Sequence, residues 1–503
     1  MRKLVIGRIA SFVVVVSVFL VHAVFFSRAL AYDAVDDAYI SFRYAQNLAQ
    51  GHGLVFNPGE RVEGYTNFLW TVLLAPFIAV GLPAGPTSIV IGLVFAIATL
   101  WLVLRSLHLI GSSPASPLGL LAAALLAVDG SFALWSASGM ETALFAFLVL
   151  VGTVTYLREL RHEPRFPWSG LLFAAAAMAR PEGVLYFGLA VTHAGLYRLV
   201  AQRRLSAWSD LLRVASFGVI YGGYFLWRYD YYGDLLPNTF YAKVTLEDTQ
   251  AQYQRGLEHV RAFAGYHSAW ITVPLALIAL ARQRARWWAS LLVLVITIYV
   301  GYIIYVGGDW SVGRFFVPIL APFYLLVAAG VETGIDLARG RWPHLGGPAG
   351  RVVASLALAG LLGLVFWGAS IRGEYRQFIQ AFDAARAARA RTAMGHWLRE
   401  NVPPRTLIAV DAAGQVPYHS GLPAVDLFGI TDPQIAHLQV QTMGEGTPGH
   451  EKFGLPQVLA RQPAYIVIYG NALDGSSEYR RLHVRWTDDP ELYSFLSIYR
   501  RIE

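Results

Sequence analysis

Long apolar stretches recur along the first 370 residues of the chain, and short polar segments separate them. A transmembrane helix needs about 20 mostly apolar residues. We expect membrane spans near residues 9–29, 88–109, 117–135, 142–157, 168–179, 183–197, 211–229, 266–281, 287–306, 315–335 and 352–369. The spans 168–179 and 183–197 are short, and we expect two helices broken at Arg180-Pro-Glu-Gly183. This pattern predicts an α-helical polytopic membrane protein with about 11 transmembrane helices.

The segment 68–80 is apolar over only about 13 residues and contains Pro76, which suits an interfacial or re-entrant helix. If this segment does not cross, the N-terminus and nearly every basic cluster before residue 370 lie on one face, as the positive-inside rule requires of cytoplasmic loops. These clusters contain Arg105, Arg158, Arg161, Arg165, Arg198, Arg203, Arg204, Arg282, Arg284, Arg286, Arg339, Arg341 and Arg351. We therefore predict a cytoplasmic N-terminus and a C-terminus on the outer face.

The first span is followed by Ala29-Leu-Ala, which resembles a signal-peptidase site. Cleavage there is the alternative to an uncleaved first helix. Because the apolar run is long enough to cross and many spans follow, we expect the helix to be retained.

The composition agrees with a membrane protein. The chain has 503 residues, of which 55% are hydrophobic and 15% charged, and its mean hydropathy is +0.45. A net charge of +7 suggests nucleic acid at first. The basic residues, however, fall in short clusters between apolar spans, which favours membrane anchoring, so we expect no nucleic-acid partner. The absence of cysteine excludes disulfides and zinc–thiolate sites.

The character of the chain changes after about residue 370. Residues 370–400 are charged and rich in alanine and arginine, which predicts a helix. Short apolar strands are predicted at Thr406–Val410 and Ala464–Ile468. We therefore predict two domains: residues 1–370 in the membrane, with an outer loop at 30–87, and an extracytoplasmic α/β domain at 371–503.

The adjacent carboxylates Asp36 and Asp37 open a polar loop directly after the first span. Polar groups near a bilayer are unfavourable unless solvated or paired, so their concentration indicates a site. On a helix the two side chains point about 100° apart, so one could act as a general base while the other binds a cation or orients a substrate. The alternative is that the pair only begins a helix, where acidic residues suit the dipole.

The span count places further charged residues on the same outer face: Arg43, Glu141, Arg180, Glu182, Lys243, Asp309 and Arg314. Carboxylates together with cations suit transfer from a phosphate-linked donor, because a base removes a hydroxyl proton while cations stabilise the phosphate leaving group. Taken singly, each arginine or lysine could instead be an interfacial residue whose charged end reaches toward water. Glu141 and Asp309 could be helix caps, and we interpret Asp129 as structural.

Two segments of the first outer loop, Asp36–Ala45 and Gly53–Asn67, resemble the GT-C superfamily of membrane glycosyltransferases. The resemblance is to the branch that contains the terminal arabinofuranosyltransferases of actinobacterial cell walls and their uncharacterised bacterial relatives. Similar elements recur at Ser138-Gly-Met-Glu-Thr142, Arg180-Pro-Glu-Gly183, Asn238-Thr-Phe-Tyr-Ala-Lys243, Gly307-Gly-Asp-Trp310, Ile408–Tyr418 and Asp426–Asp432.

The resemblance implies a sugar donor carried on polyprenyl phosphate, an acceptor glycan or lipid of the cell envelope, and a location in the bacterial cytoplasmic membrane. It also implies a membrane-parallel helix that matches 68–80 and a base in the first loop, for which we favour Asp36 because it comes first in the motif. The donor-phosphate or substrate-binding residues would be Arg43, Glu63, Asn67, Glu141, Arg180, Glu182, Asn238, Lys243, Asp309 and Arg314. Many relatives use a divalent metal, so Asp36 and Asp37 could bind Mg²⁺, Mn²⁺ or Ca²⁺.

The sequence leaves other functions open. A helix broken at Pro181 and charges within the membrane region are also typical of a transporter or flippase of polysaccharide or lipid. A non-catalytic membrane assembly protein is a third possibility, because a fold can outlive its chemistry. The chain lacks an obvious carbohydrate-binding β-sandwich, so the identity of the sugar stays open as well.

Overall fold

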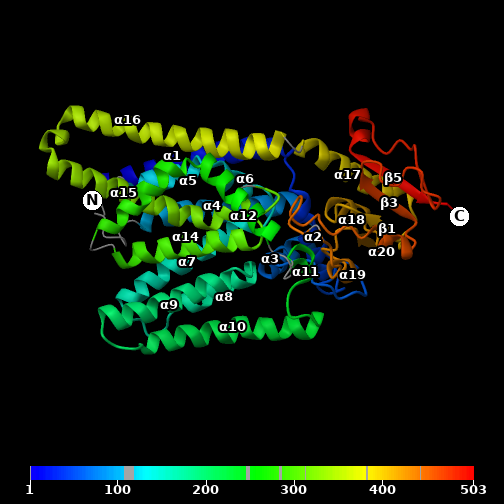
Figure 1. Ribbon diagram of the computed structural model, residues 1–503, viewed down its shortest axis with the longest axis horizontal. Coiled ribbons are helices and arrows are strands. Elements are labelled where there is room, and N and C mark those ends of the chain that lie inside the picture. The colour runs from blue at the N-terminus through cyan, green and yellow to red at the C-terminus, as the bar shows by residue number, and fades with distance from the viewer. Residues whose placement is uncertain are drawn as a thin grey trace.

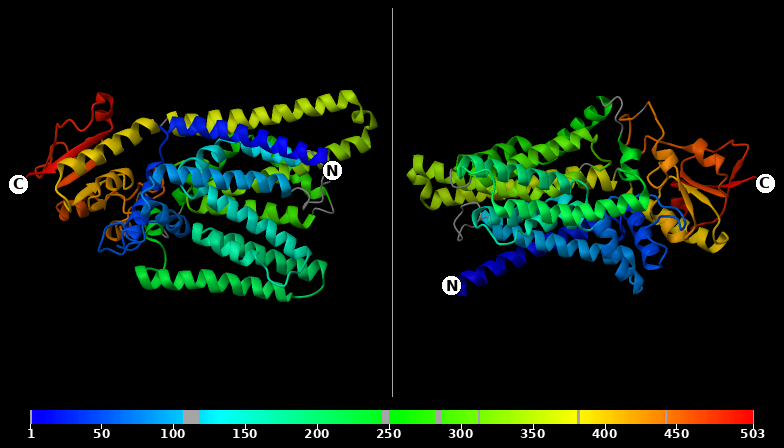
Figure 2. Two further views of the ribbon diagram at one scale, coloured as in Figure 1. Left: turned by 180° about the vertical axis from the view of Figure 1, so that it is seen from behind. Right: turned by 90° about the horizontal axis from the view of Figure 1, so that it is seen from below.

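The computed structural model describes residues 2–106, 118–244, 250–282, 286–311, 313–380, 383–441 and 443–502. Arg284 and the end of the expected span 88–109 lie outside these residues. Figure 1 shows a long bundle of helices with a small sheet at one end, close to the C-terminus. Both views of Figure 2 keep the sheet at that end, and the left view, like Figure 1, places α10 and α16 on opposite sides of the bundle.

Apolar helices make up the bundle, and the predicted spans account for most of them. Their bounds are α1 (Arg2–Ala29), α4 (Ala84–Ser106), α7 (Thr142–Arg161), α8 (Ser169–Ala179), α9 (Gly183–Ala201), α10 (Trp208–Tyr232), α14 (Arg286–Tyr305), α15 (Val317–Arg341) and α16 (Pro348–Val365). Within the described residues, seven helices are long and apolar enough to cross a membrane, or up to nine if each of two bent pairs forms one span. A multi-pass membrane protein is therefore confirmed, while the number of 11 crossings stays a prediction.

The expected span 117–135 is broken, and a second bend lies at the start of the expected span 266–281. The helices α5 (Leu118–Ala127) and α6 (Gly130–Ser136) meet at a bend of 65°, and α12 (Gln250–Tyr266) and α13 (Ala269–Ile278) meet at 83°. The prediction of one helix over 117–135 is wrong because the Asp129 carboxylate caps α6, accepting from the Phe132 amide at 3.1 Å. The same carboxylate contacts His267 Nε2 at 2.9 Å, so the two breaks meet inside the bundle.

The loop after α1 contains two helices, α2 (Asp36–Ala49) and α3 (Phe68–Ala79). The predicted short apolar helix at 68–80 is confirmed, with Pro76 inside it. It packs against α2 and buries Trp70 and Leu74. Its orientation relative to a bilayer stays a prediction.

After α16 the chain continues through a π-helical segment, η6 (Phe366–Gln380), and α17 (Ala384–Asn401), so the predicted boundary at 370 falls inside a helical segment. The five strands that follow form one sheet in the order β2-β1-β3-β5-β4. β1 is parallel to β2 and β3, and β5 is antiparallel to β3 and β4. Their bounds are β1 (Ile408–Val410), β2 (Ala424–Asp426), β3 (Tyr465–Tyr469), β4 (Tyr479–Arg481) and β5 (Leu496–Arg501), with the short helices α18 (Gln415–Ser420), α19 (Pro433–Ala436) and α20 (Leu455–Ala460) between them.

The sheet shares an apolar core with the membrane half. Ile40, Tyr44 and Phe56 of the first loop pack in one cluster with Val410 and Ile498 of the sheet. The loops that follow β1 and β2 leave the same edge of the sheet, because the two strands are parallel. That edge faces the first loop, so the C-terminal segment helps to build whatever site lies there. Whether residues 371–503 fold as a domain on their own stays a prediction.

Candidate active site

A cavity of about 260 Å³ lies at the end of the bundle that faces the sheet. It brings together polar motifs that are far apart in the sequence. The predicted site residues that line it are Asp37, Asn67, Glu141, Arg180, Glu182, Lys243, Asp309 and Arg314. Ile430 and Pro448 of the C-terminal segment complete the wall.

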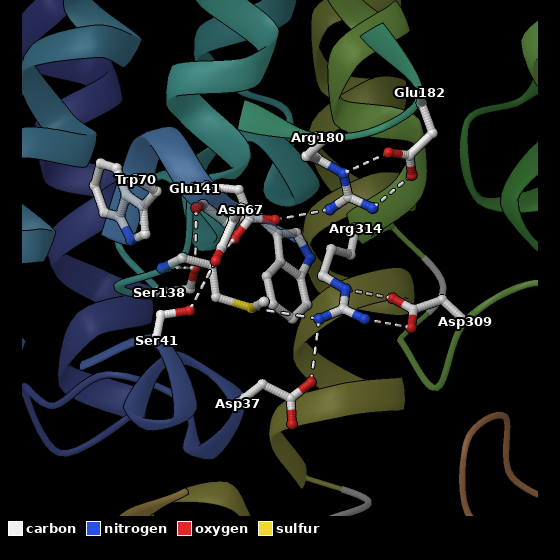
Figure 3. Close-up of polar contacts among 12 residues, drawn as sticks. Asp37, Ser41, Asn67, Trp70, Ser138, Glu141, Arg180, Glu182, Asp309 and Arg314 are labelled. Atoms are coloured by element: carbon white, nitrogen blue, oxygen red, sulfur yellow. Dashed lines mark hydrogen bonds and ion pairs between the residues drawn. The ribbon is translucent and has the colours of Figure 1, made fainter. Parts of the chain in front are cut away.

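Asp37 shares Arg314 with a second carboxylate (Figure 3). Arg314 Nη1 lies 3.2 Å from Asp37 Oδ2, and its Nε and Nη2 donate to the two oxygens of Asp309 at 2.5 and 2.6 Å. This two-pronged contact fixes the plane of the guanidinium. Gly307 and Gly308 have φ of +80° and +78°, so they form the tight turn that brings Asp309 into place. Asp37 also accepts from Trp310 Nε1 at 3.2 Å.

Asp37 is the carboxylate that a ligand can reach, because 29% of its side chain is exposed. Burial opposes its ionisation, but the nearby charges of Arg314 and Lys243 lower the pKa of Asp37 below its usual value. Asp37 is therefore ionised at neutral pH and can accept a proton or a hydrogen bond from a hydroxyl group.

A second ion cluster lines the same cavity beside Arg314 (Figure 3). Arg180 donates to Glu141 at 2.9 Å and to Glu182 at 2.8 Å. Asn67 Nδ2 donates to the other oxygen of Glu141 at 2.7 Å. Arg180 follows α8 and Glu182 precedes α9, on either side of Pro181. The break between these two apolar helices therefore places both charged residues in the cavity.

The charges of the cavity differ in how they are compensated. Arg314 lies between Asp37 and Asp309, and Arg180 lies between Glu141 and Glu182. Lys243 ends the short helix α11 (Asn238–Lys243) and lines the same cavity. Within the described residues, no carboxylate lies within ion-pair distance (4.0 Å) of Lys243, although its charge acts on Asp37. Its ammonium group is therefore available to contact an anionic ligand.

Asp36 lies in different surroundings from Asp37. Its carboxylate does not line the cavity. It points into the C-terminal segment and accepts from the amides of Gly414 at 3.2 Å and Gln415 at 2.9 Å. The rotation of about 100° between neighbouring helical residues sends Asp36 and Asp37 to different partners. Which aspartate is the base stays a prediction, and the geometry favours Asp37 over Asp36.

Three further predicted residues lie outside the cavity and hold the loop, α10 and the sheet together. Arg43 donates to a backbone carbonyl of the first loop, that of Phe56, and to one of the C-terminal segment, that of Leu422, at 2.7 Å each. Glu63 forms a buried ion pair with Arg228. Asn238 Nδ2 donates to the carbonyls of Gly429 and Ile430 at 2.8 and 2.9 Å.

The sequence reasoning missed several partners of these residues. Trp310 donates to Asp37, and its position in the motif Gly307-Gly-Asp-Trp310, which resembles the family, could have indicated a place in the site. Arg228, Gln415 and Arg391 carry no such local signal, because each acts on a residue distant in the sequence.

The adjacent carboxylates do not fit a shared metal site. Both oxygens of Asp36 accept from backbone amides, while Asp37 faces Arg314 and Trp310. Within the described part of the chain, no group of three or more histidine, cysteine, aspartate or glutamate side chains is arranged to hold a metal ion. A divalent cation stays a prediction.

Comparisons with known proteins agree with this architecture. Residues 376–500 match a domain of unknown function, DUF8728. A terminal β-(1→2)-arabinofuranosyltransferase of Mycobacterium tuberculosis is 31% identical over 358 residues, which are 61% of this chain and 54% of the relative. The enzyme with the same name in Corynebacterium glutamicum is 26% identical over 380 residues, covering 62% of this chain and 49% of the relative. The chain thus spans about half the length of these curated relatives.

Among solved structures, ArnT from Cupriavidus metallidurans bound to undecaprenyl phosphate is similar over 97% of both chains, with a TM-score of 0.58 and 13% identity. At this identity the likeness concerns the fold. The resemblance to the GT-C superfamily is therefore confirmed: the chain has the GT-C fold, and part of it is related in sequence to two arabinofuranosyltransferases.

Proposed function

From the GT-C fold and the cavity at one end of its helix bundle, we propose that this protein is a membrane glycosyltransferase. It moves a sugar from a polyprenyl-phosphate donor to a hydroxyl group of a cell-envelope glycan or lipid. The observation that carries the proposal is the reachable, ionised Asp37 in the same cavity as Lys243. The names of the two relatives support a pentose such as arabinofuranose, and the undecaprenyl phosphate bound to ArnT supports the donor class.

In the proposed reaction, Asp37 removes the proton of the acceptor hydroxyl as that oxygen bonds to the anomeric carbon of the sugar. The bond between the anomeric carbon and the phosphate oxygen breaks. Its electron pair leaves with polyprenyl phosphate, which is a stable anion, so no general acid is needed. Lys243 and Arg314 stabilise the charge that grows on the phosphate.

The positive-inside pattern supports an orientation in which the cavity and the C-terminal sheet face the outside of the bacterial cytoplasmic membrane. Nucleotide sugars are made and kept in the cytoplasm, so an outward cavity has no access to them. A lipid-linked donor reaches the cavity within the bilayer instead. This orientation gives the proposed donor class its physical reason.

Binding of the leaving group tests the proposal. Undecaprenyl phosphate should raise the thermal unfolding temperature of the detergent-purified protein, because a ligand at 100 times its Kd adds about 2.7 kcal/mol of stability. Undecaprenol, which has the same chain without the phosphate, is the matched control and should stabilise much less. Equal effects of the two lipids, or no effect of either, would contradict a phosphate-binding cavity.

A further inference from the structure

The first turn of α2 is held from the C-terminal half of the chain. Asp36 accepts two backbone hydrogen bonds from Gly414 and Gln415, which are 378 and 379 residues away in the sequence. These amides belong to a segment made of the four residues after β1 and the first residue of α18, which we call the loop 411–415. Neighbouring residue Asp37 points instead into the cavity. One turn of helix is thus bound on one side by the sheet and open on the other to a ligand.

The hydrogen bonds to Asp36 do not cap its own helix α2; their donors are the amides at the start of α18. The residue that precedes α2 is Val35, and no side chain caps the helix there. The alternative that the aspartates only begin the helix therefore does not describe the contacts of Asp36. Its carboxylate is used across the junction between the two halves of the chain.

A partly buried arginine supports the same contact. Arg391 of α17 lies with Nε 3.7 Å from Asp36 Oδ1, and its guanidinium stacks over Tyr469 at the end of β3, 5.2 Å from the ring centroid. Asp411, at the start of the loop 411–415, accepts from the Tyr469 amide at 2.5 Å. These contacts hold the loop and Arg391 in a fixed relation to Asp36.

The fit between the loop and α2 leaves no space. A Cβ atom added to Gly414 would lie 2.0 Å from the Asp36 carbonyl oxygen and 2.7 Å from its Cγ. Contacts this short force one of the two segments to move. Gly414 therefore permits a direct backbone contact that a larger residue would push apart.

We propose that the loop 411–415 and Arg391 form a clamp on Asp36 that positions Asp37 in the cavity. The proposal rests on the proposed function, in which Asp37 is the base. Because neighbouring residues on a helix keep a fixed angle, holding Asp36 sets both the rotation of α2 and the direction of Asp37. Two adjacent aspartates are then needed, because Asp36 holds the helix in place and Asp37 acts in the cavity. The C-terminal segment is then part of the catalytic apparatus.

Two substitutions test the clamp from different sides. Gly414→Ala pushes the loop away from Asp36, and Arg391→Met removes the counter-ion. A misplacement of about 1 Å lowers rate by about 10²-fold, so each variant should lose turnover on this scale. The affinity for undecaprenyl phosphate, measured by thermal shift, should change little, because Lys243 and Arg314 stay in place. Arg391→Lys should restore part of the turnover.

Matched controls separate positioning from general damage. Gly360→Ala adds the same methyl group where nothing lies within 4 Å, and Arg386→Met removes an arginine of α17 that pairs with Asp383 and Glu491. Both controls should turn over like the wild type. If Gly414→Ala does not fold, Arg391→Met and Asp36→Asn decide the question.

The outcomes distinguish the clamp from the proposed function. If Asp37→Asn keeps wild-type turnover, the proposed function fails. If Asp37→Asn is inactive while Arg391→Met and the folded Gly414→Ala variant turn over like their controls, the clamp alone is contradicted. A loss of undecaprenyl phosphate binding in parallel with turnover would also overturn it, because the clamp acts on the direction of the base and not on the phosphate.

Discussion

Asp37→Asn is expected to lower turnover by about 10²–10⁴-fold, the usual loss when a general base is removed. Asparagine keeps the size of the side chain but cannot take up the acceptor proton. Arg314 keeps its two bonds to Asp309, so the wall of the cavity should stay in place. The affinity for undecaprenyl phosphate should therefore change far less than turnover. The measurement is kcat in proteoliposomes, after membrane expression and thermal unfolding have been checked.

Asp383→Asn is a suitable control, because Asp383 pairs with Arg386 on the exposed side of α17. The pH dependence adds an independent check. Since Arg314 and Lys243 hold the pKa of Asp37 below its usual value despite burial, the base stays ionised as pH falls from 7 toward 5. Titration of Asp37 should therefore contribute no loss of kcat/KM in that range. Wild-type turnover in Asp37→Asn would reduce Asp37 to an ion-pair partner of Arg314.

Lys243→Met is expected to lower kcat/KM for the donor by about 10- to 10²-fold, because a hydrogen bond to a charged group contributes about 1.5–3 kcal/mol. The phosphate is present in both the bound donor and the transition state, so KM should rise as well as kcat fall. Among the residues the structure describes, no carboxylate lies within ion-pair distance of Lys243, and Asp37 keeps its contact with Arg314 when Lys243 is replaced.

The measurement is the dependence of initial rate on donor concentration. Arg158→Met is the matched control, since Arg158 lies in the last turn of α7, on a different surface. An unchanged KM in Lys243→Met, with wild-type turnover, would show that Lys243 does not contact the donor phosphate.

The sequence predicted the elements that depend on local pattern. Apolar length gave the membrane helices and the short helix at 68–80, because burial of a continuous apolar surface depends on neighbouring residues. The break at Asp129 escaped prediction. Its carboxylate is stabilised by His267 and by Tyr324, which lie 138 and 195 residues away. Without those partners, residues 117–135 read as one apolar span.

In the site, too, local motifs could be predicted and contacts between distant segments could not. The motifs that contain Glu141, Arg180 and Arg314 were expected to meet on one face, and the structure brings them to one cavity. The choice between Asp36 and Asp37 needed the position of Gly414 and Gln415, and no local pattern contains that information. Arg43, Glu63 and Asn238 are polar and near the motifs, but their partners are backbone carbonyls and an arginine of distant segments.

Transfer of label from donor to acceptor tests the central claim most directly. Purified protein in proteoliposomes is given radiolabelled polyprenyl-phosphate arabinose, mannose or aminoarabinose, or a nucleotide sugar, together with a cell-envelope glycan extract. Asp37→Asn serves as the blank. The account predicts that label moves to the glycan from at least one lipid-linked sugar, that Asp37→Asn abolishes the transfer, and that nucleotide sugars give none. Transfer from a nucleotide sugar alone, or equal transfer by Asp37→Asn, would contradict it.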